Sequence, residues 1–133
     1  MPTAEQVQAA VATYAAAVSS ADKEAIMACY SEQATVTDPY PGPTHVGTEG
    51  VSGFWDGVLG LGTPKSFTPD RVVVAGDRGV FSFTIQIEIG EGEGRARLEV
   101  AGYDILTVDD AGLIADQLAY WDPAAMRPVP LPD

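Results

Sequence analysis

Asp38 ends a short alternating segment in a position that suits a catalytic base. By period-two counting its side chain shares a face with Ala34 and Val36, so we expect the carboxylate to point toward the core. Pro39 follows, which favours an extended backbone at Asp38 and removes an amide donor that would otherwise bind the carboxylate. An Asp-Pro pair is also an ordinary way to begin a turn, and the residues alone leave both interpretations open.

Asp104 lies in a second alternating segment whose other inward residues are apolar. No lysine or arginine is close in sequence, and the same-face neighbours are Val100, Gly102, Leu106 and Val108. Because desolvation disfavours a charged carboxylate, we expect Asp104 to stay protonated and to donate a hydrogen bond. The alternative is an aspartate exposed at a strand edge by a bulge near Gly102.

Tyr14 lies on the apolar stripe of a predicted helix. A tyrosine in that position usually packs in the core with its hydroxyl satisfied locally. Its hydroxyl can equally donate a hydrogen bond into a pocket, and the residue alone does not decide between the two roles.

Other kinds of chemical site find little support. His45 is the sole histidine, with no second histidine or thiolate to complete a metal site, and we expect it on a surface loop. Cys29 is the only cysteine, so no intramolecular disulfide can form, and its apolar neighbours predict a buried thiol. Ser52 stands in Gly-Val-Ser-Gly, which is not the elbow of a nucleophilic serine.

The composition predicts one domain spanning residues 1–133, because 133 residues with 46% hydrophobic content supply one core. Nineteen acidic against seven basic residues give a net charge of −12, which repels nucleic acid and anionic membranes. The first residues show no basic region before an apolar run, and no apolar stretch is long enough to span a membrane. We therefore expect a cytoplasmic, soluble protein with neither of these partners.

Three helices are predicted in the first half of the chain. Thr3 and Gln6 form a capping-box pattern for the first, whose apolar stripe is Val7, Val11, Tyr14 and Val18. Asp22 can cap a short second helix whose shared face is Ile26, Cys29 and Tyr30. After a strand ending at Asp38 and the proline-rich stretch 39–43, Thr48 can cap a third helix, with the apolar face Val51, Phe54, Trp55, Val58 and Leu59.

The second half alternates with the period of strands. One long face carries Phe81, Phe83, Ile85, Ile87 and Ile89. Breaks at 76–79, 90–94 and 109–112 separate four strands, which favours an antiparallel meander. Helices followed by strands predict an α+β fold, in which a strongly curved, mainly antiparallel sheet wraps the three helices as a cone and encloses a pocket. Residues 127–133 are expected to be an extended or disordered tail.

Several segments together resemble the bacterial Δ5-3-ketosteroid isomerases. The first half contributes Val-Ala-Thr-Tyr-Ala-Ala-Ala-Val around Tyr14, Ala-Thr-Val-Thr-Asp-Pro around Asp38, and Gly-Thr-Glu-Gly-Val-Ser-Gly-Phe-Trp at 47–55. Val-Ala-Gly-Tyr-Asp-Ile-Leu around Asp104 and Ala-Tyr-Trp at 119–121 follow, after a few extra residues. The resemblance implies the cone of the nuclear transport factor 2 (NTF2)-like and SnoaL-like superfamily, a homodimer, and catalysis with neither metal nor organic cofactor.

The resemblance also implies a reaction and roles for named residues. Asp38 would move a proton between carbons of a steroid-like 3-ketone, while Tyr14 and neutral Asp104 hold the dienolate oxygen. Tyr30 would support Tyr14, and Trp121 would line the cavity. The remaining residues expected in the substrate pocket or its hydrogen-bond network are Phe54, Trp55 and Phe83.

One departure from the family is Trp55, where relatives often have a tyrosine. An indole N–H donates but cannot accept, so the network around Tyr14 is expected to be shorter. Other reactions on the same cone stay open, chiefly that of a SnoaL-like polyketide cyclase. An epoxide hydrolase resembling the limonene enzyme would need an arginine between two aspartates, which is not apparent. A noncatalytic NTF2-like binding module is the third alternative.

Overall fold

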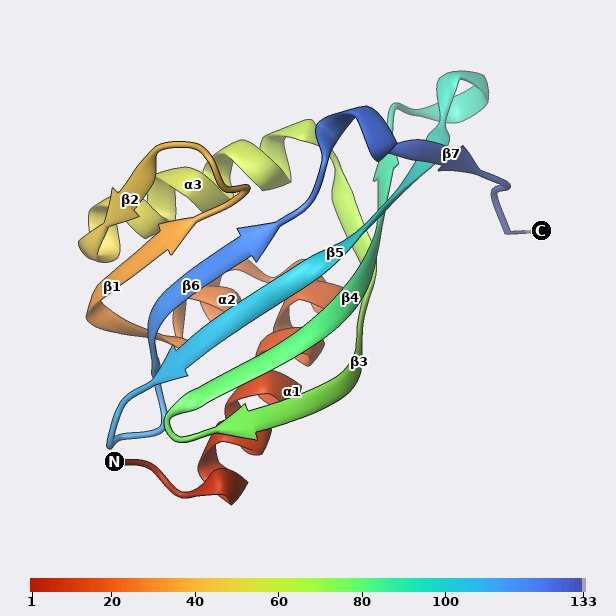
Figure 1. Cartoon of the computed structure of the whole chain (residues 1–133). Helices are drawn as coiled ribbons and strands as arrows, with labels where there is room; N and C mark the ends of the chain where they lie inside the picture. The colour runs from red at the N-terminus through yellow and green to blue at the C-terminus, as the bar shows by residue number, and fades with distance from the viewer. Residues whose placement is uncertain (133) are drawn as a thin grey trace.

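The computed structural model describes residues 1–132, whose elements are arranged as Figure 1 shows. The helices in these residues are α1 (Ala4–Ser20), α2 (Lys23–Met27) and α3 (Gly47–Leu61). The strands are β1 (Tyr30–Thr37), β2 (Thr44–Val46), β3 (Thr63–Ala75), β4 (Arg78–Ile89), β5 (Ala96–Val108), β6 (Ile114–Tyr120) and β7 (Arg127–Val129). Two short 3-10 helices span Gly92–Gly94 and Pro123–Ala125. Within this part of the chain, no helix combines the length and the apolarity needed to cross a bilayer.

Helix α1 begins where its cap residues predict. Thr3 and Gln6 form the expected capping box, in which each side chain accepts a bond from the other's backbone amide. The buried stripe of α1 packs mainly against β3, and Tyr14 on this stripe is only 2% exposed. Tertiary burial of the stripe therefore fixes where the Tyr14 side chain lies.

Helix α2 is shorter than its apolar pattern suggests. Asp22 caps it as predicted, but the helix ends at Met27, and Tyr30 is the first residue of β1 rather than part of a helical face. The chain leaves the helix because the carbonyl of Cys29 accepts a hydrogen bond from the amide of Ile114, where β6 begins. The predicted burial of both Cys29 and Tyr30 is confirmed.

The predicted cap of α3 is wrong. Val46 occupies the cap position without a side-chain bond, and the hydroxyl of Thr48 instead donates to the carbonyl of Glu32. Gly47, with a φ of 74°, turns the chain directly from β2 into the helix. The helix therefore starts one residue before Thr48 and needs no cap from it.

The four strands after α3 form the predicted antiparallel meander, in the order β3, β4, β5 and β6. Strand β1 then pairs with β6 in parallel and β2 adds at the edge, so the sheet is mixed. Because parallel strands end at the same edge of a sheet, the residues that follow β1 and β6 come to one place. These residues are Asp38 and Trp121.

The sheet curves around α1 and α3, which lie against its concave face (Figure 1). Residues from the helices and from the inner face of the sheet form one core cluster, which includes Val18, Val36, Trp55, Phe81 and Leu106. The predicted α+β class and the curled-sheet cone are confirmed. The stretch 127–133, expected as an extended or disordered tail, includes strand β7, which pairs with β5. Residue 133 lies outside the described residues.

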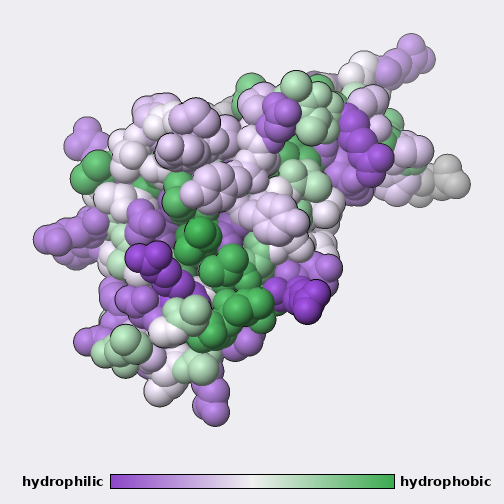
Figure 2. All heavy atoms as spheres, in the orientation of Figure 1, coloured by the Kyte–Doolittle hydropathy of each residue, from purple (hydrophilic) through white to green (hydrophobic). Residues whose placement is uncertain are grey.

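The convex face of the sheet carries a row of apolar residues. Val80, Ile105 and Leu118 lie in register on β4, β5 and β6, and alternate along the strands with the buried Phe81 and Asp104. Figure 2 shows hydrophobic side chains gathered over these strands, with hydrophilic residues around them. The expected homodimer stays a prediction, for which this row offers an apolar surface.

Gly102 on β5 leaves no room for a side chain. A Cβ at this position would stand 2.4 Å from the Tyr120 carbonyl oxygen and 2.8 Å from the Cβ of Trp121. Gly102→Ala should therefore lower the free energy of unfolding by about 1–3 kcal/mol, the usual range for overpacking. Gly60→Ala is the matched control, because nothing lies within 4 Å of a Cβ at that exposed position of α3. Equal stability of the two variants in chemical denaturation would contradict this account.

Candidate active site

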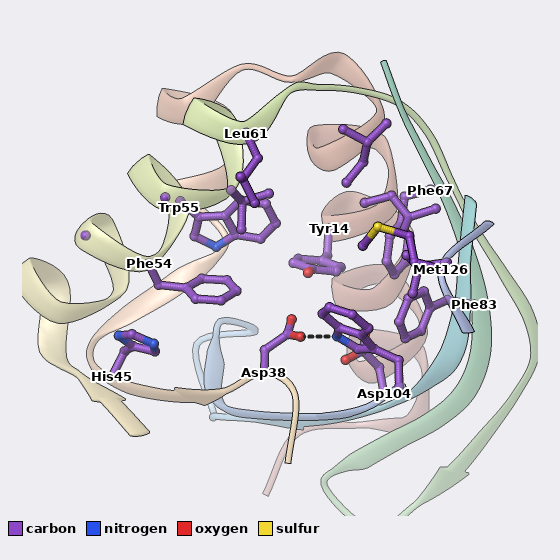
Figure 3. Close-up of a pocket in the computed structure, with 17 residues that line it drawn as sticks. Tyr14, Asp38, His45, Phe54, Trp55, Leu61, Phe67, Phe83, Asp104 and Met126 are labelled. Carbon is purple, nitrogen blue, oxygen red and sulfur yellow. Dashed lines mark hydrogen bonds between the residues drawn. The ribbon is translucent and has the colours of Figure 1, made fainter. Parts of the chain in front are cut away.

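A cavity of about 550 Å³ lies between the helices and the concave face of the sheet. Its walls are mostly apolar, from aromatic and aliphatic residues such as Phe54, Val58, Phe67, Phe83, Ile87 and Met126. The ionisable side chains that line it are Tyr14, Asp38, His45 and Asp104 (Figure 3). A few polar groups converging in an apolar cavity are typical of a small-molecule site.

Asp38 lies at the edge where β1 and β6 end together. The indole nitrogen of Trp121 donates a hydrogen bond of 2.6 Å to Asp38 Oδ1, across this edge (Figure 3). Burial raises the pKa of the Asp38 carboxyl above its usual value, and the Trp121 bond and the nearby His45 oppose part of that rise. Asp38 is therefore held in one place and accepts a proton more readily than an exposed aspartate.

Asp104 points inward from β5 and is 1% exposed. The alternative of an exposed edge aspartate is wrong, because β5 lies between β4 and β6. In the described part of the chain it forms no salt bridge, and it accepts one hydrogen bond of 3.4 Å, from Gln117 Nε2. Burial, together with the nearby Asp38, raises the pKa of Asp104 well above its usual range. Burial therefore favours the protonated form of Asp104, which can donate a hydrogen bond.

Tyr14 presents its hydroxyl to the same cavity from α1. Its ring packs edge-on against Phe67, with ring centroids 5.2 Å apart, and edge-on against Tyr30 and Trp55. Its hydroxyl oxygen accepts a hydrogen bond of 2.9 Å from Gln117 Nε2. Burial raises the pKa of Tyr14 well above its usual value, so the hydroxyl keeps its hydrogen.

The other residues predicted from the sequence fall in or directly behind the cavity. Phe54, Trp55, Phe83 and Trp121 all line it. Tyr30 lies behind Tyr14, with ring centroids 6.3 Å apart. The structure thus brings all eight predicted residues to one place, and their roles stay predictions.

The expected place of His45 is wrong. Instead of standing on a surface loop, His45 lies in β2 and lines the cavity, with its ring 5.1 Å from that of Phe54. The reason is strand pairing, because β2 places His45 opposite the fully buried Val36 of β1. The short strand after the prolines gave no alternation from which this could be read.

Gln117 is a site residue that reasoning from sequence missed. It is 1% exposed and lies on β6, between Tyr14 and Asp104, to both of which it donates. Its Oε1 accepts a bond of 2.5 Å from the Tyr30 hydroxyl, which in turn accepts one of 3.1 Å from Trp55. The period-two pattern carried the signal, because Gln117 shares a face with Trp121.

The expectation of a shorter network around Tyr14 than in relatives stays a prediction, and the structure shows how Trp55 takes part. The Trp55 indole donates no bond directly to Tyr14 but starts a chain of hydrogen bonds that reaches Tyr14 through Tyr30 and Gln117. An indole that can only donate is suited to the first position of such a chain.

The model of the SnoaL-like domain family matches residues 11–117, which is most of the chain. The chain belongs to the SnoaL-like domain family. The curved-sheet cone described above is the NTF2-like fold that this membership implies.

Proteins that are similar to this chain are named for different activities. The Steroid Delta-isomerase of Nocardioides simplex is 29% identical over 125 residues, covering 94% of this chain and 97% of that protein. The epoxide hydrolase/cyclase-like enzyme SalBIII, from pyran ring formation in salinomycin, superposes with a TM-score of 0.85 at 17% identity, over 97% of this chain and all of that one. The Δ5-3-ketosteroid isomerase of Mycobacterium sp. superposes with a TM-score of 0.78 at 23% identity, over 93% of this chain and 98% of that one. Structural likeness at these identities shows the fold, so the function has to be argued from the site.

The bond from Trp121 to Asp38 makes a measurable prediction. Trp121→Phe removes the indole N–H that stabilises the carboxylate, so the pKa of Asp38 should rise further. Trp55→Phe is the control, because it removes an indole N–H that is bonded to Tyr30 instead. Titration of the Asp38 side-chain carbon by NMR measures both, and an unchanged pKa in Trp121→Phe would contradict the assigned bond.

Proposed function

We propose that the protein is a steroid delta-isomerase, which moves a carbon–carbon double bond from the 5,6 to the 4,5 position of a 3-ketosteroid. One observation carries the proposal: a single apolar cavity is lined by a carboxylate suited to act as base and by two side chains that keep their hydrogens. The base is Asp38, and the two donors are Tyr14 and Asp104. The identity to the Nocardioides simplex enzyme over nearly the whole chain supports the same reaction.

The proposed reaction needs one proton to leave and return. Asp38 takes a proton from carbon 4, and the electron pair of that C–H bond moves into a dienolate whose negative charge lies on the 3-oxygen. The protonated Asp38 then delivers the proton to carbon 6, which leaves the double bond at 4,5. No atom is gained or lost, so the base is regenerated in each cycle.

The barrier lies in placing negative charge on the 3-oxygen, and two hydrogen-bond donors fixed in advance lower it. Tyr14 is 2% exposed and Asp104 1% exposed, so water does not weaken their hydrogen bonds. A charged Asp104 would repel the developing oxyanion, which is why its raised pKa matters for this reaction. The same burial that makes Asp104 neutral thus makes it useful.

The apolar walls suit a rigid hydrocarbon skeleton. Most of the lining is aliphatic or aromatic, and a volume of about 550 Å³ lies in the ordinary range for sites that hold small molecules. A small hydrophobic steroid-like ligand is therefore the proposed substrate class.

A cyclisation is the second candidate, because the same base and donors could deprotonate a hydroxyl and protonate a leaving oxygen. The SnoaL-like family membership and the fold shared with SalBIII keep this reaction open. A binding module without catalysis is the third.

The deciding experiment mixes the purified protein with a 5-ene-3-ketosteroid and follows the ultraviolet absorbance of the conjugated product. Asp38→Asn should lower kcat by about 10²- to 10⁴-fold, since it removes the general base. Tyr14→Phe should lower it by about 10²- to 10³-fold, the range for one oxyanion donor. Circular dichroism and steroid binding control for folding. Turnover by Asp38→Asn equal to that of the wild type would sink the mechanism, and steroid binding without any turnover would favour the third candidate.

The pH dependence separates the base from the acid. Asp38 works deprotonated, so kcat/KM should fall as the pH drops through its raised pKa. Asp104 works protonated, so kcat/KM should also fall as the pH rises through the raised pKa of Asp104. Asp104→Asn cannot ionise and should lose this alkaline limb while it keeps the acidic one. An alkaline limb unchanged in Asp104→Asn would assign it to another group.

A further inference from the structure

We propose that Gln117 is the positioning residue that orients both oxyanion donors, because its amide occupies an acceptor position on Tyr14 and on Asp104 and so leaves both O–H groups to donate into the cavity. The kinetic consequence rests on the proposed isomerase function, but the hydrogen-bond argument does not. Four hydrogen bonds among buried side chains carry it.

First, the Trp55 indole fixes the direction in which the hydrogen bonds run from Trp55 to Gln117. The indole nitrogen of Trp55 can only donate, and it lies 3.1 Å from the oxygen of Tyr30. Tyr30 therefore accepts this bond and uses its own hydrogen toward Gln117, whose Oε1 lies 2.5 Å away. The three side chains are between 1% and 7% exposed, so water does not compete for these positions.

The second step fixes the amide. Oε1 of Gln117 accepts the Tyr30 hydrogen, and Nε2 of the same amide therefore faces the other way. From that position Nε2 lies 2.9 Å from the Tyr14 oxygen and 3.4 Å from Asp104 Oδ1. In the reversed amide Nε2 would face the Tyr30 oxygen, and the Tyr30 hydrogen would lose its acceptor on Gln117.

The third step concerns the cavity. Once the Tyr14 oxygen accepts from Gln117, the hydroxyl hydrogen of Tyr14 can turn from the neighbouring Tyr30 hydroxyl to a ligand in the cavity. Once Oδ1 of neutral Asp104 accepts from the second amide hydrogen, its acidic hydrogen is placed on the other oxygen. Each donor in a hydrogen-bonded chain polarises the next, so Tyr14 becomes a stronger donor than it would be alone.

A merely structural Gln117 would fill space and satisfy Tyr30 without changing the donors. The two roles differ in what a ligand oxygen gains. Orientation predicts that Gln117 strengthens binding of a ligand oxygen that accepts hydrogen bonds from Tyr14 and Asp104, whereas packing predicts an equal effect on ligands with and without that oxygen.

The test compares two probes of nearly equal shape, 2-naphthol and naphthalene, on the wild type and on Gln117→Met. We expect the wild type to prefer 2-naphthol, and Gln117→Met to lose about 10- to 100-fold of that preference while binding naphthalene unchanged. Gln33→Met is the control, because Gln33 is exposed on β1. An unchanged preference in Gln117→Met, or none in the wild type, would overturn the proposal.

Kinetics and a second variant complete the test. In the isomerase assay Gln117→Met should lower kcat with little change in KM, and the alkaline limb should move to higher pH, because Asp104 loses the bond that stabilises its charged form. Tyr30→Phe frees the amide to turn, and it should lower the naphthol preference in the same direction if Gln117→Met does not fold. A preference that falls in a protein without isomerase activity would refute the proposed function and keep the role of Gln117.

Discussion

The burial of Asp104 without a positive partner is the constraint on which the site depends. A carboxyl group at the centre of a sheet, in contact with apolar neighbours, is tolerable only in its neutral form. A neutral carboxyl group needs an acceptor for its hydrogen, and the cavity is the place where a ligand can supply one. In the proposed mechanism, the desolvation that costs stability therefore prepares Asp104 to donate to an electron-rich oxygen, a stability–function trade-off that many sites show.

The mixed sheet decides where Asp38 lies relative to Asp104. A purely antiparallel meander would have ended β1 and β6 at opposite edges, whereas their parallel pairing brings Asp38 and Trp121 together. Gly102 then lets β5 pass close to Trp121, where any Cβ would collide. The position of the Asp38 carboxylate thus depends on three features from different parts of the chain. They are the pairing of β1 with β6, the absence of a side chain at Gly102 and the indole N–H of Trp121.

Local patterns predicted much of this molecule. The capping box at Thr3, the alternation along β4 and the apolar neighbours of Asp104 are properties of neighbouring residues, and the structure has them where the sequence indicates. The failures lie where distant pairing decides: β6 ends α2 early, and β1 turns His45 inward. For Gln117 the alternation predicts only that the side chain shares a face with Trp121, whereas its role depends on three partners from distant parts of the chain.

The cavity is polar around Asp38, Tyr14 and Asp104 and apolar near Leu61 and Met126, which are 77% and 37% exposed. In the proposed complex one ligand oxygen would accept the hydrogen bonds, and the rest of the ligand would contact apolar walls. Such walls select ligands by shape more than by chemical group. Contacts of that kind are made equally before and during a reaction, so they change affinity more than turnover. Substitutions in the apolar walls could therefore change which ligand skeleton fits, without changing the proposed acid–base residues Asp38, Tyr14 and Asp104.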